Sequence, residues 1–288
     1  MATAQGSTRL AVLIDADNAQ PSVIEGLLAE VAKLGVASVK RIYGDWTSTT
    51  TTQWKQSLLP HSITPVQQFA YTKGKNSTDA SLIIDAMDLM HTHRFQGFCL
   101  VSSDSDFTAL ARRLREDGLV VYGFGERKTP DAFVAACDKF IYTEVLRPAS
   151  AEVAAVPESS APQSKPNGAP ASPVAAEPAS TATPAKPPEN QQVPLDLIRQ
   201  AIEEESDDSG WAHLGAVGSY IQRIRADFDA RLYGSKKLSD LLKRYPKHFD
   251  IEERAAPGSS SKAVYVRKPA TLPGELNGSA TPPVARTA

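Results

Sequence analysis

The sequence has only two cysteines, and this scarcity excludes two classes of protein. Cys99 lies inside an apolar run and Cys137 lies in a later apolar segment. Neither has the short spacing of cysteine metal ligands or an evident disulfide partner. A disulfide-built scaffold and a cysteine-ligated zinc site are therefore not expected, and we predict that the chain works in a reducing compartment.

The chain also lacks a membrane segment and a strong net charge. No run approaches the roughly 18 apolar residues of a membrane span, and residues 1–8 contain no apolar signal region. We therefore expect a cytoplasmic protein without a membrane partner. The formal net charge is only −2, so any binding to nucleic acid has to come from local basic patches.

One internal segment, residues 149–193, has few large apolar side chains and consists mainly of Pro, Ala and Ser. Such a composition cannot bury a core, so it predicts a disordered linker whose ends lie on the order of 40 Å or more apart. The linker divides the chain into a first domain, residues 1–148, and a second domain, residues 194–268. Residues 269–288 are predicted to form a disordered tail.

Strand and helix patterns alternate through the first domain. The predicted strands are 9–14, 39–43, 65–70, 98–101, 120–124 and 140–143. The predicted helices are 21–34, 53–59, 79–91, 107–117 and 131–136. This alternation predicts an α/β fold in which helices cover both faces of a parallel sheet.

Acidic residues follow two of these strands and open one helix. Asp15 follows the first apolar run, Asp104 and Asp106 follow the fourth, and Asp79 opens the third helix. Ligands of a parallel sheet sit outside the carboxyl ends of its strands, so these carboxylates should lie close together. Their repulsion favours a divalent cation. We predict an Mg²⁺ or Mn²⁺ site in which Asp15 and Asp104 hold the ion, while Asp79 and Asp106 complete the shell or orient water.

The acidic residues and the segments near them allow three other interpretations. Asp17, Asp104 and Asp106 could instead cap the helices that follow them. The segment 15–17 is also similar to the opening of haloacid-dehalogenase-like phosphatases, although Ala19 stands where that chemistry expects Thr or Val. A nucleotide cofactor is not expected, because Phe69 stands where a phosphate-binding P-loop requires glycine.

Polar and basic residues beside the expected site are candidates for binding substrate. Lys73 and Lys75 would contact the phosphates of a bound strand, and Asn18 could orient a water or a ligand. The segment that begins with Ser102 and Ser103 could bind phosphate through backbone N–H groups at a helix start.

The apolar pattern of the second domain predicts a small winged helix-turn-helix fold. Apolar residues indicate helices near 195–202, 214–224 and 238–242, and two strands follow at 249–253 and 263–267. A basic cluster on or beside the third helix predicts contact with a phosphate backbone, and the alternative is a solvated helix face. Its candidate residues are Lys236, Lys237, Lys243 and Arg244.

The first domain resembles the NYN family, a branch of the PIN-like nucleases. The matching segments are 13–18, 73–79, 100–107 and 123–125, followed by Thr129 and Pro130. The resemblance implies a PIN-like Rossmannoid sheet and Mg²⁺- or Mn²⁺-dependent ribonuclease activity. It assigns that activity to Asp15, Asp79, Asp104 and Asp106.

The second domain resembles the LOTUS, or OST-HTH, module. The matching positions include Trp211, Leu214, Ile221, Tyr233 and Phe249. This family is associated with RNA binding, so the resemblance implies RNA as the partner. The sequence thus predicts a metal-dependent ribonuclease whose LOTUS-like domain captures RNA, and the alternatives are a catalytically quiet RNA-binding adaptor and a small-molecule phosphatase.

Overall fold

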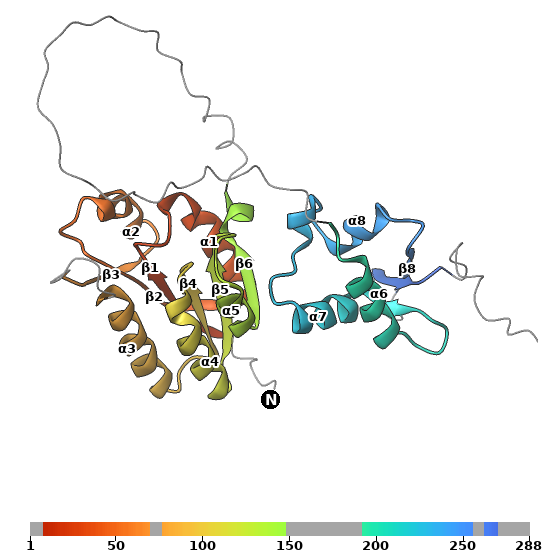
Figure 1. Cartoon of the computed structure of the whole chain (residues 1–288), viewed down its shortest axis with the longest axis horizontal. Coiled ribbons are helices and arrows are strands. Elements are labelled where there is room, and N and C mark those ends of the chain that lie inside the picture. Colours follow the sequence, from red (N-terminus) through yellow and green to blue (C-terminus); the bar gives the residue numbers. More distant parts are fainter. Residues whose placement is uncertain (1–7, 70–76, 148–191, 256–261, 270–288) are drawn as a thin grey trace, which may run out of the picture.

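The computed structural model describes residues 8–69, 77–147, 192–255 and 262–269 (Figure 1). The first part of the chain forms one six-stranded sheet. Its strands are β1 (Arg9–Asp15), β2 (Val36–Gly44), β3 (Thr64–Gln67), β4 (Gly97–Val101), β5 (Val120–Gly125) and β6 (Lys139–Tyr142). Each neighbouring pair is parallel, so the predicted parallel sheet is confirmed.

Helices cover both faces of this sheet, as predicted. The helices are α1 (Ile24–Leu34), α2 (Lys55–Leu58), α3 (Ser77–His91), α4 (Thr108–Glu116) and α5 (Asp131–Ala136). Short 3-10 helices lie at η1 (Pro21–Val23), η2 (Thr50–Trp54), η3 (Ser105–Phe107) and η4 (Thr143–Leu146). One core cluster joins the sheet to α3, α4 and α5, and a second joins it to α1. Strand β1 is buried on both faces, which explains its continuous apolar run.

The strand order places β1 and β4 side by side. The order is β3-β2-β1-β4-β5-β6, so the chain leaves β1 toward one edge and later returns to β4 on its other side. Ile14 is paired with Val101, and Asp15 and Ser102 follow that pair directly. In open α/β sheets such a reversal creates a crevice outside the carboxyl ends of the strands.

The second part of the chain forms a small winged unit. Its elements are α6 (Leu195–Glu204), β7 (Ala212–His213), α7 (Leu214–Ile224), η6 (Ala230–Tyr233), α8 (Leu238–Lys243), β8 (Asp250–Ala255) and β9 (Lys262–Arg267). The helices and strands enclose a core of their own around Ile198, Val217 and Leu241. The three strands pair in the antiparallel order β7-β9-β8.

Most element boundaries agree with those predicted from the sequence. The predicted helix 53–59 is divided between η2 and α2, and the two-residue strand β7 was not predicted. The predicted linker and tail lie outside the described residues, apart from their borders. Among the helices that the structure describes, none is long and apolar enough to cross a membrane.

Candidate metal centre

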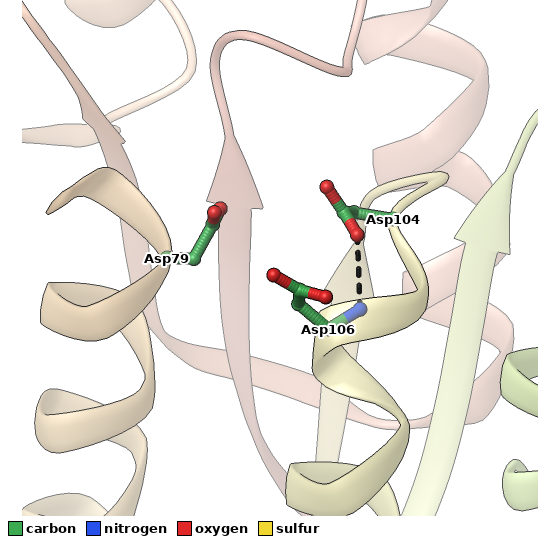
Figure 2. A group of neighbouring side chains, drawn as sticks. All are labelled: Asp79, Asp104 and Asp106. Atoms are coloured by element: carbon green, nitrogen blue, oxygen red, sulfur yellow. Dashed lines mark hydrogen bonds between the residues drawn. The ribbon is translucent and has the colours of Figure 1, made fainter. Parts of the chain in front are cut away.

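Three aspartates from two separate segments meet beside the ends of the central strands (Figure 2). Asp79 lies in the first turn of α3. Asp104 immediately precedes η3, and Asp106 lies within it. One carboxylate oxygen from each lies within 4.8 Å of the other two. Their approach brings together three of the four carboxylates that the sequence assigned to the site.

Asp104 has a structural role as well as a place in this group. Its backbone is extended, with φ −90° and ψ 136°, and its carboxylate accepts a hydrogen bond of 2.9 Å from the N–H of Asp106. This is the helix-capping role considered as an alternative. An ionised carboxylate has about four lone-pair sites, so one oxygen can cap η3 while the other faces a cation.

Asp15 lies beside this group, at the end of β1, with 0% of its surface exposed. One oxygen accepts the N–H of Asp17 at 3.0 Å. The other accepts the amide N–H of Asn18 and the hydroxyl of Ser102, both at 2.8 Å. Burial raises the pKa of Asp15, and the bonds from Asn18 and Ser102 oppose that rise. Asp15 is therefore a buried, hydrogen-bonded carboxylate next to the group of three.

The electrostatics of the site link all four predicted carboxylates. Burial first, and then the negative charges of Asp15, Asp104 and Asp106, together raise the pKa of Asp79 to about 6. Carboxylate oxygens are the hard ligands that Mg²⁺ and Mn²⁺ prefer. A divalent cation would remove the repulsion that disfavours ionisation of Asp79. The donor set therefore fits such a cation.

Two serines directly after β4 point into the protein. The hydroxyl of Ser102 donates to Asp15 and accepts the N–H of Asp104 at 3.1 Å. The hydroxyl of Ser103 accepts the N–H of Glu126 at 2.8 Å. Both side chains are buried, so their hydroxyls hold the loop in place. The N–H groups of Asp104 and Asp106, expected to be available to phosphate, are engaged within this loop.

Asn18 and Asp17 connect β1 with the start of α3. Asn18 donates its side-chain amide to Asp15 and so orients a carboxylate of the site. The carboxylate of Asp17 accepts the hydroxyl of Thr78 at 3.3 Å. Thr78 precedes Asp79, so this contact joins the loop after β1 to the segment that carries Asp79. Thr78 was not singled out in the sequence, where a threonine before an acidic helix start gives no distinctive signal.

Asp85 lies on the same helix as Asp79 but serves another purpose. Its two carboxylate oxygens accept bonds from Arg41 and from the hydroxyl of Tyr43, both on β2. The contact pairs a charge and satisfies the hydroxyl of a fully buried tyrosine. Asp85 therefore fastens α3 to the sheet.

The remaining basic candidates differ in their surroundings. Lys73 and Lys75 lie outside the described residues. Arg244 donates to the carbonyl of Tyr233 at 2.7 Å, which makes it a brace within the second unit. Lys243 faces Glu253 at 3.6 Å. Lys236 and Lys237 line a groove of about 430 Å³.

Comparisons with known proteins identify both parts of the chain. The family model described as the NYN domain matches residues 9–146. The model described as the OST-HTH/LOTUS domain matches residues 186–260. A search of curated proteins finds no match to this chain.

Three solved structures are similar to parts of the chain. An uncharacterized protein of Nitrosomonas europaea, solved by NMR, is 45% identical over 33% of this chain and 91% of that one, with a TM-score of 0.26. A protein of unknown function from Vibrio parahaemolyticus, solved by crystallography, is 19% identical over 48% and 94%, with a TM-score of 0.40. An NMR structure of residues 175–257 of a Chromobacterium violaceum protein is 31% identical over 29% and 87%, with a TM-score of 0.23.

The order of the matched segments, the parallel sheet with its acidic switch point and the winged unit that follows agree with one another. The chain is thus an NYN-domain protein of the PIN-like fold with a C-terminal OST-HTH/LOTUS domain.

Proposed function

We propose that this protein is a metal-dependent ribonuclease. One observation carries the proposal: Asp79, Asp104 and Asp106 converge within 4.8 Å in a domain of a nuclease family. The group lies where the strand order reverses, the usual ligand position of an open α/β sheet. The OST-HTH/LOTUS domain supports RNA as the substrate.

The four carboxylates would have two roles: some would bind the ion and one would support the site from below. Asp79, Asp104 and Asp106 would hold Mg²⁺ or Mn²⁺, and Asp15 would add a fourth negative charge from the buried side. A bound divalent ion supplies Lewis-acid stabilisation and lowers the pKa of water. Ser102 and Asn18 would keep Asp15 ionised and oriented, since both donate to its carboxylate.

RNA would be held on both domains, which we take to span residues 1–148 and 194–268. Lys73 and Lys75 precede the site in sequence and would contact the phosphates of the strand being cleaved. On the OST-HTH domain, Lys236 and Lys237 line a groove and would contact the phosphates of the captured RNA. A tethered second domain raises the effective concentration of bound RNA near the site, without further contacts at the reacting bond.

The structure argues against the phosphatase alternative. That chemistry uses an aspartate oxygen as a nucleophile, which has to reach the phosphorus atom of the substrate. Asp15 is fully buried, and both of its oxygens accept hydrogen bonds within the protein. A carboxylate so placed suits a supporting role in an ion site.

Cleavage of end-labelled single-stranded and hairpin RNA tests the proposal. The purified full chain would be assayed with Mg²⁺, Mn²⁺ or EDTA, beside Asp104→Asn. We expect metal-dependent products and a loss of at least about 100-fold in the variant, because several kcal/mol of charge stabilisation would be removed. Asparagine is also a good cap, so the variant should keep its fold. RNA binding without products in either protein would instead identify the adaptor.

A further inference from the structure

Strand β6 forms one edge of the NYN sheet, and the OST-HTH domain contacts it. Figure 1 shows the second unit on the β6 side of the sheet. The N–H of Phe140, on β6, donates a hydrogen bond of 2.9 Å to the carbonyl of Ala226, just after α7. Edge strands present unpaired backbone groups that other segments can bind. A main-chain contact of this kind therefore covers part of the edge.

Side chains extend this contact along β6. The hydroxyl of Tyr142 donates to Asp227 at 3.2 Å. Asp227 also faces the guanidinium of Arg225 at 3.4 Å. Arg225 thus holds the carboxylate of Asp227 in place, and this carboxylate faces Tyr142 on β6.

A buried acid on α1 supplies the second anchor. Glu30 lies among the buried residues of α1, and its side chain is 9% exposed. It pairs with Lys33 on its own helix and with Arg231 of the OST-HTH domain. Burial would raise the pKa of Glu30, but the bonds from Lys33 and Arg231 together lower it below its ordinary value. Arg231 is itself oriented by Asp229. Its guanidinium is therefore held in position to pair with Glu30.

We infer that the OST-HTH domain docks on β6 and α1 of the NYN domain through its segment from Arg225 to Arg231. The footprint is narrow and polar, and grooves of about 490 and 430 Å³ lie along it. Inter-domain contacts of this character resemble transient interfaces. The docking is therefore reversible, and salt weakens it only in part, since Glu30 is buried while Arg231 is 28% exposed.

Docking also has a consequence for RNA, which rests on the proposed function. Lys236 and Lys237 of the OST-HTH domain line the same groove as Lys33 and Lys139 of the NYN domain. Four lysines from two domains then face one space. The lysines proposed to capture RNA are thereby held beside the NYN domain.

Distance measurements between spin labels in the full chain test the docking without RNA or metal. Labels would be attached through Leu59→Cys, at a residue that is 91% exposed, and Asp208→Cys, on the other domain. The natural cysteines, Cys99 and Cys137, are buried and should stay unlabelled. A docked pair of domains gives one narrow distance distribution at low salt.

Charge reversal then identifies the contact. Glu30→Arg and Arg231→Glu should each broaden the distribution, and the double variant should narrow it again because the opposite charges are restored. Lys268→Glu is the matched control, because Lys268 pairs with Glu203 inside the OST-HTH domain and lines neither of the two grooves. It should leave the distribution narrow. Tyr142→Phe, which removes only one hydroxyl, should raise the undocked fraction severalfold.

Two results would overturn the inference. One is a broad distribution in the chain with both natural charges at low salt. The other is a narrow distribution that both single reversals leave unchanged. Circular dichroism of each variant separates loss of docking from loss of folding, and neither result bears on whether the NYN domain cleaves RNA.

Discussion

The hydroxyl of Ser102 donates a hydrogen bond of 2.8 Å to the buried carboxylate of Asp15, and so joins the ends of β4 and β1. The same hydroxyl accepts the N–H of Asp104. One small side chain therefore connects the buried acid to the loop that carries Asp104 and Asp106.

Replacement of Ser102 by alanine should weaken the metal site. The change removes a donor to an ionised carboxylate, which is worth about 1.5–3 kcal/mol. We expect the affinity for Mn²⁺, measured by titration calorimetry, to fall at least about tenfold. Ser103→Ala is the control, because its hydroxyl contacts the N–H of Glu126 and not a site acid. Equal losses of metal affinity in the two variants would contradict the role given to Ser102.

Two substitutions at Asp104 should separate its two roles. Asp104→Asn keeps an acceptor for the N–H of Asp106, whereas Asp104→Ala does not. Both should abolish metal-dependent cleavage, but the alanine variant should unfold with a free energy about 1 kcal/mol lower than the asparagine variant. Urea denaturation of both, without metal, measures the difference. Identical unfolding curves would show that the cap contributes no stability.

Neutralising Asp79 should stabilise the metal-free protein at neutral pH. Its pKa of about 6 in the folded state exceeds the ordinary value of 3.8. The folded protein therefore binds more protons than the unfolded chain between these values, so stability falls as pH rises through this window. Above it, Asp79→Asn should be more stable on the order of 1 kcal/mol, since the carboxylate is partly exposed and solvent screens it.

Thermal unfolding in EDTA at about pH 4 and about pH 7.5 checks this sign. The advantage of Asp79→Asn should be present at the higher pH and absent at the lower one. Added Mg²⁺ should raise the melting temperature of the natural chain more than that of the variant, because only the natural chain has the full set of ligands. A variant less stable at both pH values would contradict the account.

Lys236 and Arg244 should differ in their effects on RNA binding. Lys236→Gln should weaken binding of single-stranded RNA of any sequence and reduce the slope of log K against log salt by about 0.7. Arg244→Gln should instead lower stability, because its guanidinium braces the carbonyl of Tyr233. Fluorescence anisotropy over a salt series measures RNA binding by the two variants, and thermal unfolding measures their stability. An unchanged slope for Lys236→Gln would remove Lys236 from the RNA surface.

Much of the fold follows from patterns that are local in the sequence. The run from Leu10 to Ile14 is apolar at every position, which is the signature of a strand buried on both faces. Local patterns also predict Asp79 in the first turn of α3, and Asp104 and Asp106 after β4. Neighbouring residues were enough to find them.

Other features depend on residues far apart in the sequence. The bond between Ser102 and Asp15 spans 87 positions, and the pair of Arg231 with Glu30 spans 201. No local pattern distinguishes a serine that supports a carboxylate from one that faces solvent. The strand β7, with two residues, is too short to show the alternation that identifies strands. In the sequence Arg244 belongs to a basic cluster, whereas in the structure it donates to the carbonyl of Tyr233, eleven positions away.

The clustering of Asp79, Asp104 and Asp106 also bears on the history of the chain. The charges of Asp104 and Asp106 oppose ionisation of Asp79, so a neutral residue at position 79 would stabilise the metal-free fold of a protein that no longer used this carboxylate. Sites that oppose stability are kept where activity requires them. A chain retained only as an RNA-binding adaptor would be under no pressure to keep Asp79, whereas the proposed ribonuclease requires it.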